Sequence, residues 1–164
     1  MRLRLLLALA VAAATAAGCA TSRNLQPAQS TRADVEAALG QPAEVRPRSD
    51  GETWLYYPNQ PFGRKVQVAR VAPDGKLIAV EQRLSEEYIA KLIPNQSSRD
   101  DVLALFGRPY ERLNVPRMAR DMWTWHMRQY GTLKATLNVQ MSPDGVVREV
   151  YVLDDNDTRD GKKK

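Results

Sequence analysis

Residues that could carry out chemistry are few in this chain of 164 residues, and their spacing favours no reaction. His126 is the only histidine, which argues against a multi-histidine metal site and most nucleophile–histidine pairs. Asp100 and Asp101 are adjacent, so on a helix they point in different directions and do not form paired carboxylates. The sequence has no Cys-x-x-Cys, glycine-rich phosphate loop, Gly-x-Ser-x-Gly or His-Glu-x-x-His motif. We therefore expect a protein that is not an enzyme and has no metal or cofactor.

Cys19, the only cysteine, belongs to an N-terminal pattern of its own. A basic start, Met1-Arg-Leu-Arg, precedes an apolar run at 5–17 that is too short to span a bilayer. The run ends in Ala-Ala-Gly-Cys-Ala at 16–20, which resembles a bacterial lipobox, where the peptide is cut before the cysteine and the sulfur carries diacylglycerol. The alternative is an ordinary signal peptide with a chance cysteine at its end.

The lipobox resemblance implies a covalent diacylglycerol and an N-acyl lipid on Cys19. Several acyl chains, at about 0.8 kcal/mol per buried CH₂, make a firm anchor. Ala20 stands where an aspartate would direct retention in the inner membrane, so the pattern suggests the periplasmic side of the outer membrane. The net charge of +5 fits contact with an anionic membrane, although an ordinary soluble surface explains it better.

Aromatic and arginine side chains are the other candidates for function, because Trp, Tyr and Arg dominate interface hot spots. Four aromatics on predicted strands are expected in a core between sheet and helices or, alternatively, on a binding face: Trp54, Tyr56, Trp123 and Trp125. Alternation places His126 opposite Trp125, either on the solvent side of its strand or lining a groove. Seven further residues, in or near loops or on the opposite strand face, are candidates for partner contact: Tyr57, Phe62, Arg64, Tyr110, Arg112, Arg128 and Tyr130.

The elements that must position these side chains occur twice. The segments R-A-D-V-E-A-A-L-G-Q-P at Arg32–Pro42 and R-D-D-V-L-A-L-F-G-R-P at Arg99–Pro109 share six of eleven residues, 67 positions apart. Each predicts a short helix with a Ser or Thr N-cap and an Asp three residues later, as in a capping box. Each also has an apolar stripe and a Gly-x-Pro stop, with the glycine expected in the left-handed C′ position.

Three strands are predicted after each helix. Pro-Asp-Gly at 73–75 and at 143–145 predicts the turn before the last strand of each copy. Trp-Leu-Tyr at 54–56 aligns with Trp-Thr-Trp at 123–125, sixty-nine positions apart. Poor alternation in one strand predicts a bulge there. The expected strands are Thr53–Tyr57, Lys65–Val71 (with the bulge) and Lys76–Gln82, then Met122–Tyr130, Leu133–Met141 and Val146–Leu153.

Together these patterns predict an α+β fold of two tandem units, each with one or two short helices packed on a three-stranded antiparallel sheet. Arg46–Glu52 is predicted to be a turn, and Ser85–Ile93 a helix that opens the second unit. Units of about 65 residues are marginally stable alone, so the two are expected to share a core. The expected segments are a signal peptide at 1–18, a lipidated tether at 19–29, repeats at 30–84 and 85–153, and a charged, disordered tail at 154–164.

The order of these motifs is similar to the small outer-membrane lipoprotein A family, which includes the E component of the outer-membrane β-barrel assembly machine. The motifs are a capped helix ending in Gly-x-Pro, a polar turn, a Trp-x-Tyr or Trp-x-Trp strand, an amphipathic strand and an Asp-Gly turn. The resemblance covers about residues 23–83 and 85–153. It implies a lipid-anchored protein that acts by contact with proteins and lipid, without catalysis. The duplication is also similar to secreted β-lactamase-inhibitor proteins.

Two functions follow as hypotheses. The first is an outer-membrane lipoprotein that acts by protein–protein contact in outer-membrane protein assembly or envelope integrity, with the β-barrel assembly machine as a candidate partner. The alternative is a periplasm-facing inhibitor or binding module that docks on an enzyme through its sheet face. No nucleic-acid partner is expected. Lys162–Lys164 could touch lipid headgroups, or the tail could simply be solvated.

Overall fold

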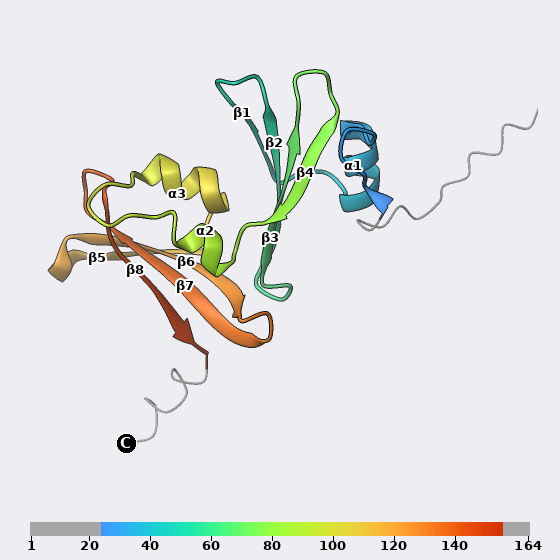
Figure 1. The fold of residues 1–164 in the computed structure, drawn as a ribbon. Helices are drawn as coiled ribbons and strands as arrows, with labels where there is room; N and C mark the ends of the chain where they lie inside the picture. The colour runs from blue at the N-terminus through green and yellow to red at the C-terminus, as the bar shows by residue number, and fades with distance from the viewer. Residues whose placement is uncertain (1–23, 156–164) are drawn as a thin grey trace, which may run out of the picture.

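The computed structural model describes residues 24–155, and it contains two units, each with a four-stranded antiparallel sheet and short helices (Figure 1). The fold is mixed α+β, as expected, but the prediction of three-stranded sheets is wrong. The predicted signal peptide, Cys19 and most of the predicted charged tail lie outside the described residues. The first unit comprises α1 (Arg32–Leu39), β1 (Glu44–Pro47), β2 (Thr53–Asn59), β3 (Lys65–Val71) and β4 (Leu77–Gln82). The second comprises α2 (Glu86–Ile89), α3 (Arg99–Phe106), β5 (Glu111–Val115), the 3-10 turn η2 (Pro116–Met118), β6 (Arg120–Gln129), β7 (Leu133–Met141) and β8 (Val147–Asp154).

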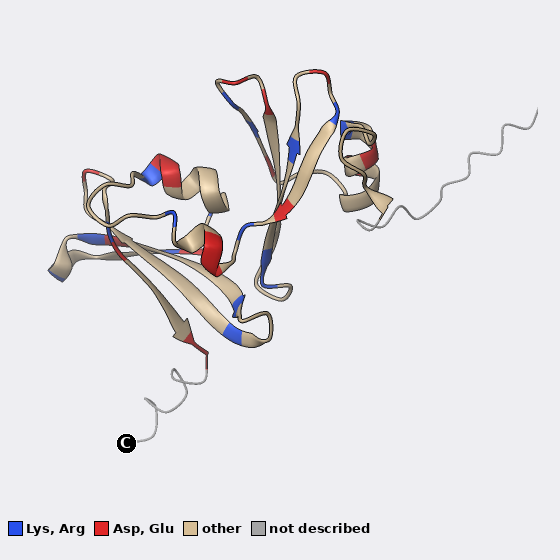
Figure 2. Ribbon diagram, in the orientation of Figure 1, with Lys and Arg blue, Asp and Glu red and all other residues tan. Residues whose placement is uncertain are grey.

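Both repeated helices begin with a complete capping box. The Thr31 hydroxyl accepts the Asp34 backbone N–H at 3.3 Å, and the Asp34 carboxylate accepts the Thr31 backbone N–H at 2.7 Å. Ser98 and Asp101 repeat the arrangement at 3.2 and 2.7 Å. These hydrogen bonds hold the pKa of both aspartates below the usual value. Figure 2 shows the resulting acidic first turn of α3.

The two helices end differently from the expectation. Gly40 has φ 85° and ψ −169°, and Gly107 has φ 66° and ψ −161°. This is the extended region at positive φ, which is open essentially to glycine alone, and it differs from the left-handed helical C′ position. Glycine is therefore required at both stops, for a backbone conformation other than the one predicted.

The edge strands β1 and β5 are the elements that the pattern did not predict. Arg46 and Pro47, expected in a turn, pair with Trp54 and Thr53 in β1. Both edge strands are short and rich in charged residues, and β1 ends in a proline, which are features that protect an exposed sheet edge. The helix expected over 85–93 is a single turn, α2, and the Ser85 side chain does not cap it.

The register of β2 and β6 corrects the alignment of the tryptophans. Leu55 pairs with Ala69 in the first sheet, and Trp123 pairs with Val139 in the second. Both sheets have a register shift before the last residue of their third strand, at the predicted bulge in β3 and again in β7. Leu55 is thus the counterpart of Trp123, sixty-eight positions apart. Because a slip of one residue reverses the face, Trp54 points away from α1 whereas Trp123 points toward α3.

The first sheet is covered on both faces. Its inner face packs on α1 in a core of Val35, Leu55, Tyr57, Ala69, Val71 and Leu77. Residues expected in a tether also pack there: Leu25 contacts this core, and the Ala28 N–H bonds the Leu77 carbonyl at 2.8 Å. The outer face shares a second core with α3 and the second sheet, which includes Tyr56, Val68, Phe106 and Trp125. The helices lie on one side of the second sheet only (Figure 1).

Candidate functional site: the cleft between the two units

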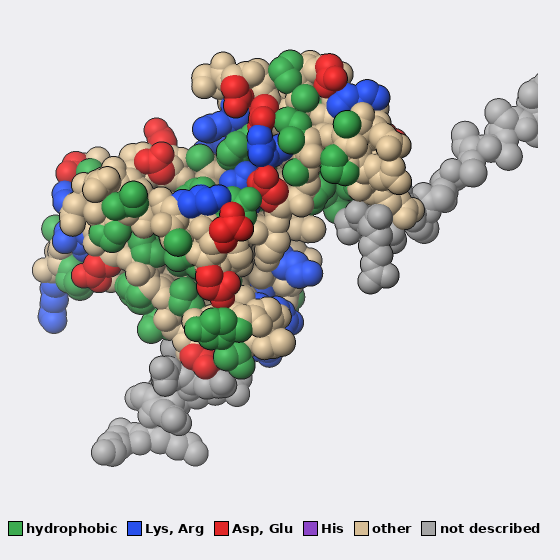
Figure 3. All heavy atoms as spheres, viewed as in Figure 1, with side chains coloured by type: hydrophobic (Ala, Val, Ile, Leu, Met, Phe, Trp, Pro, Cys, Tyr) green, Lys and Arg blue, Asp and Glu red, His purple; other side chains and the backbone are tan. Residues whose placement is uncertain are grey.

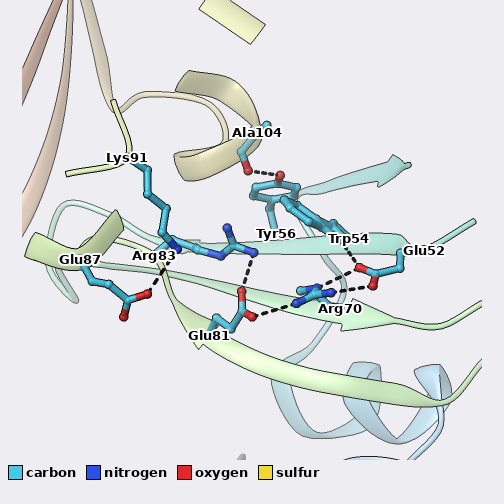
Figure 4. Close-up of polar contacts among 9 residues, drawn as sticks. All are labelled: Glu52, Trp54, Tyr56, Arg70, Glu81, Arg83, Glu87, Lys91 and Ala104. Atoms are coloured by element: carbon cyan, nitrogen blue, oxygen red, sulfur yellow. Dashed lines mark hydrogen bonds and ion pairs between the residues drawn. The ribbon is translucent and has the colours of Figure 1, made fainter. Parts of the chain in front are cut away.

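Helix α3 is docked on the outer face of the first sheet through small residues. The Tyr56 hydroxyl donates a hydrogen bond to the Ala104 carbonyl at 2.7 Å (Figure 4). Gly107 lies against the same ring, and a Cβ at this position would lie 2.9 Å from Tyr56 Cδ1. Tyr56 is 1% exposed, so this contact is part of the shared core. The close approach fixes one wall of a cleft between the units.

A charged network orients Trp54 beside this contact (Figure 4). The Trp54 indole N–H donates to Glu52 at 2.8 Å, and Arg70 donates to the same carboxylate at 2.6 and 2.9 Å. Arg70 also reaches Glu81 at 3.3 Å, and Glu81 pairs with Arg83 at 2.5 Å. The hydrogen bonds from Arg70 and Trp54 lower the pKa of Glu52 to about 2. Glu52 is therefore ionised at neutral pH and holds the indole in one orientation.

Cations and aromatic rings alternate along the same boundary. The Arg48 guanidinium lies 4.6 Å from the Trp54 ring centre, and Arg83 lies 4.6 Å from the same ring. Arg83 also lies 4.5 Å from the Tyr88 ring, above which Lys91 Nζ lies at 4.0 Å. Such contacts contribute about 0.5–2 kcal/mol, with the larger values for desolvated cations. Arg83 pairs with Glu81 of β4 and lies over Tyr88 of α2, so it joins the two units. Its side chain is 4% exposed, so these contacts are largely shielded from water.

The two ends of this series, Arg48 and Lys91, line a cleft of about 410 Å³ together with Trp54, Ile93 and Leu105. Ile93 is 49% exposed although it is apolar. Lys91 pairs with Glu87 at 3.2 Å, whereas Arg48 has no carboxylate within 4 Å in the described part of the chain. Figure 3 shows charged side chains of both signs along the boundary between the units. The cleft therefore offers apolar side chains beside Arg48, together with the carboxylate of Asp101, whose pKa the charge of Arg48 helps to lower.

Two of the residues predicted for partner contact are engaged inside the molecule. Tyr57 is 9% exposed and packs against α1, because β2 continues to Asn59 and turns this ring inward. Arg64 donates to the Ala135 carbonyl at 3.1 Å and to Asp155 at 2.5 Å, so it ties the β2–β3 loop to the second sheet. Gln60, in the same loop, bonds both backbone groups of His126, at 2.7 and 2.8 Å.

The remaining predicted contact residues lie at separate places and do not form one surface with the cleft. Phe62 is 90% exposed in the β2–β3 loop, and Tyr130 is 73% exposed in the β6–β7 loop. Tyr110 stacks edge-on against His126 with ring centres 4.8 Å apart. Arg112 covers the Trp123 ring at 4.4 Å, and Arg128 donates to the Thr132 carbonyl at 3.2 Å.

Of the four aromatics predicted in a core or at an interface, three are buried and one lies at the cleft. Tyr56, Trp123 and Trp125 are at most 4% exposed, whereas Trp54 is half-buried and lines the cleft. Arg48, Arg83 and Lys91 had no signal in the sequence. Their contacts depend on how the two units pack, and local spacing says nothing about that.

His126 lies on the open face of the second sheet, where its ring is partly buried. Burial, followed by the charge of Arg64, lowers its pKa. Its neighbours in the described residues include no hydroxyl or thiol hydrogen-bonded to the ring, and Nδ1 has no protein partner. Within 24–155 no group of three His, Cys, Asp or Glu side chains is arranged to hold a metal ion, and no helix is long and apolar enough to cross a membrane.

Comparison with known proteins adds only distant likenesses. No protein-family model and no curated protein matches the chain. A DUF4309 family protein (YjgB) from Bacillus subtilis is 16% identical, with 80% of this chain and 83% of that chain covered and a TM-score of 0.32. An extracellular protein containing an SCP domain from Bacillus anthracis is 15% identical, with 87% and 48% covered and the same TM-score. The chain thus spans about half the length of the second protein. Both likenesses are too weak to show a fold or a function.

Proposed function

We propose that this protein is a lipid-anchored, non-catalytic component of the bacterial envelope that binds a protein partner in the cleft between its units. The observation that carries the proposal is Trp54, an indole that lies partly buried at the cleft, held by Glu52 and covered by Arg48. Trp and Arg contribute most to protein interfaces when they sit in a preformed hollow. The role is outer-membrane protein assembly or envelope integrity, with the β-barrel assembly machine as the first candidate partner.

Preorganisation supports this reading. Ordering a side chain on binding costs about 0.5–1.5 kcal/mol, and the Glu52–Arg70–Glu81–Arg83 network has already ordered the indole. Ile93 and Leu105 add apolar area beside it. The partner segment that fits is apolar, with a carboxylate placed against Arg48 and away from Asp101, because Arg48 is the rim cation without an ion pair in the described residues.

The proposed anchor places the first unit at the membrane. Four residues lie between Cys19 and Asn24, so the five steps along the chain span at most about 17 Å at roughly 3.4 Å per residue. Since the described chain begins beside α1 (Figure 1), acylation of Cys19 would hold α1 near the bilayer and leave the second unit farther away.

Two experiments test the proposal separately. Fractionation of cells that express Cys19→Ser should move the protein from the membrane to the soluble periplasm. Sedimentation with membranes after a high-salt wash would overturn the anchor. Affinity capture from detergent-solubilised envelopes should recover a membrane-assembly protein with the native chain and lose it with Arg48→Glu. The matched control is Arg117→Glu, which reverses an exposed charge in η2. Recovery of a single soluble enzyme instead would support the inhibitor alternative.

A further inference from the structure

We infer that the open face of the second sheet binds helix α1 of a second copy of this chain. The inference rests on an interface that the molecule already contains, namely α3 on the outer face of the first sheet. Each unit has such a helix and such a sheet face. Within one chain, α3 occupies the outer face of the first sheet. The exposed side of α1 and the open face of the second sheet have no such contact in the described residues.

The exposed surface of α1 matches the docking surface of α3. Ala37 and Gly40 are the counterparts of Ala104 and Gly107, which approach Tyr56, and both are exposed. Gly40 has nothing within 4 Å of the position where a Cβ would lie, whereas that space is filled at Gly107. The part of α1 that corresponds to the contact surface of α3 is therefore available.

The open face can be matched to the docked one at two positions, Thr124 and Asn138, which are at most 8% exposed in the single chain. The backbone bond from Ala43 to Tyr56 recurs from Tyr110 to Thr124, both at 2.9 Å, which makes Thr124 the counterpart of Tyr56. Asn138, which pairs with Thr124, is the counterpart of Val68. The replacements are smaller or more polar, so the contact between copies must be weaker than the one within the chain. The paired rows across the open face are Glu149–Gln140–Met122–Leu113, Tyr151–Asn138–Thr124–Glu111, Leu153–Thr136–His126 and Arg128–Lys134.

Polar groups on this face point to a donor-bearing occupant. Gln140 is 8% exposed, and its side-chain oxygen has no protein partner. Glu111 and Glu149 are exposed, and neither forms an ion pair in residues 24–155. On α1 the first residue is Arg32, whose side chain is 48% exposed and pairs with Glu36 of the same helix at 2.7 Å. The guanidinium has five N–H donors, so beyond its bond to Glu36 it keeps donors for an acceptor on this face.

A contact of this kind is head-to-tail, since each copy contributes a different surface. Its test is the molecular mass of the mature chain with Cys19→Ser, measured by sedimentation equilibrium from about 10 µM to about 1 mM, the range of weak association. The mass should rise with concentration. Ala37→Arg should weaken the association at least tenfold, because a long cation replaces the small residue at the contact. Ala33→Arg is the matched control, since its counterpart Asp100 is exposed on α3.

A mixing experiment separates this arrangement from a symmetric dimer. Leu153→Arg, on the open face and 41% exposed, should block the other half of the contact. Leu153→Arg alone and Ala37→Arg alone should each be monomeric. An equimolar mixture of these two variants should form a 1:1 dimer that does not grow into larger assemblies. A native chain that stays monomeric up to 1 mM, equal effects of Ala33→Arg and Ala37→Arg, or a mixture that stays monomeric would each overturn the inference.

Discussion

Gly107→Ala is expected to destabilise the protein more than Gly40→Ala, although the two glycines end equivalent helices. Both have positive φ with ψ near 180°, and an alanine in that region costs about 1–3 kcal/mol. At Gly107 the new Cβ would also lie 2.9 Å from Tyr56 Cδ1, whereas at Gly40 it would meet nothing within 4 Å. Overpacking a core costs about 1–3 kcal/mol more. The expected losses are thus about 1–3 kcal/mol for Gly40→Ala and about 2–6 kcal/mol for Gly107→Ala.

Urea unfolding, followed by tryptophan fluorescence, measures both losses on the same chain. The excess at Gly107 should shrink when Tyr56→Leu removes the ring, which a double-mutant cycle reports as a coupling free energy. Equal losses at the two glycines, or no coupling with Tyr56, would show that α3 does not approach the first sheet as described. The helix would then end normally without docking.

Three further outcomes follow from the same contacts. Tyr56→Phe should lower the free energy of unfolding by about 1 kcal/mol, because the Ala104 carbonyl loses its hydrogen bond; no loss in urea unfolding would contradict the contact. Glu52 has a pKa of about 2 in the folded protein against 4.5 ordinarily, so the unfolded chain takes up a proton first as the pH falls. The stability that Glu52 contributes is therefore lost between about pH 4.5 and pH 2. Glu52→Gln should therefore flatten the pH dependence of unfolding in that window, and unchanged steepness would argue against the Arg70 pairing. His126 should titrate below 6.5 in an NMR pH series, because burial and Arg64 disfavour its cation, and a midpoint at or above 6.5 would be inconsistent with its packing.

The features that the sequence predicts best are those set by contacts between residues close together in the chain. The Thr31–Asp34 capping box is readable because its bonds join residues three apart, and the structure contains it. The bulge in β3 was readable from broken alternation. Strand β1 was missed because Arg46 and Pro47 have turn-like composition, and an edge strand needs no apolar side chains to pair.

Features that depend on the meeting of distant segments could not be predicted. The face that Trp54 takes depends on a register one residue away from the alignment suggested by the repeated tryptophans. Arg48 and Lys91 are forty-three positions apart and reach the same cleft only because Arg83 and Tyr88 pack between the units. The candidate site is thus a product of the docking of one repeat on the other.

Site-specific photo-crosslinking in living cells tests directly whether the cleft between the two units binds a protein partner. A photoreactive amino acid replaces Lys91, which is exposed at the rim of the cleft, or Arg117, which is exposed in η2, as the control. A discrete protein adduct is expected from position 91, and it should be absent from position 117 and lost when Trp54→Ala is added. No adduct at position 91, or the same adducts at both positions, would contradict the assignment of the cleft as the partner-binding site.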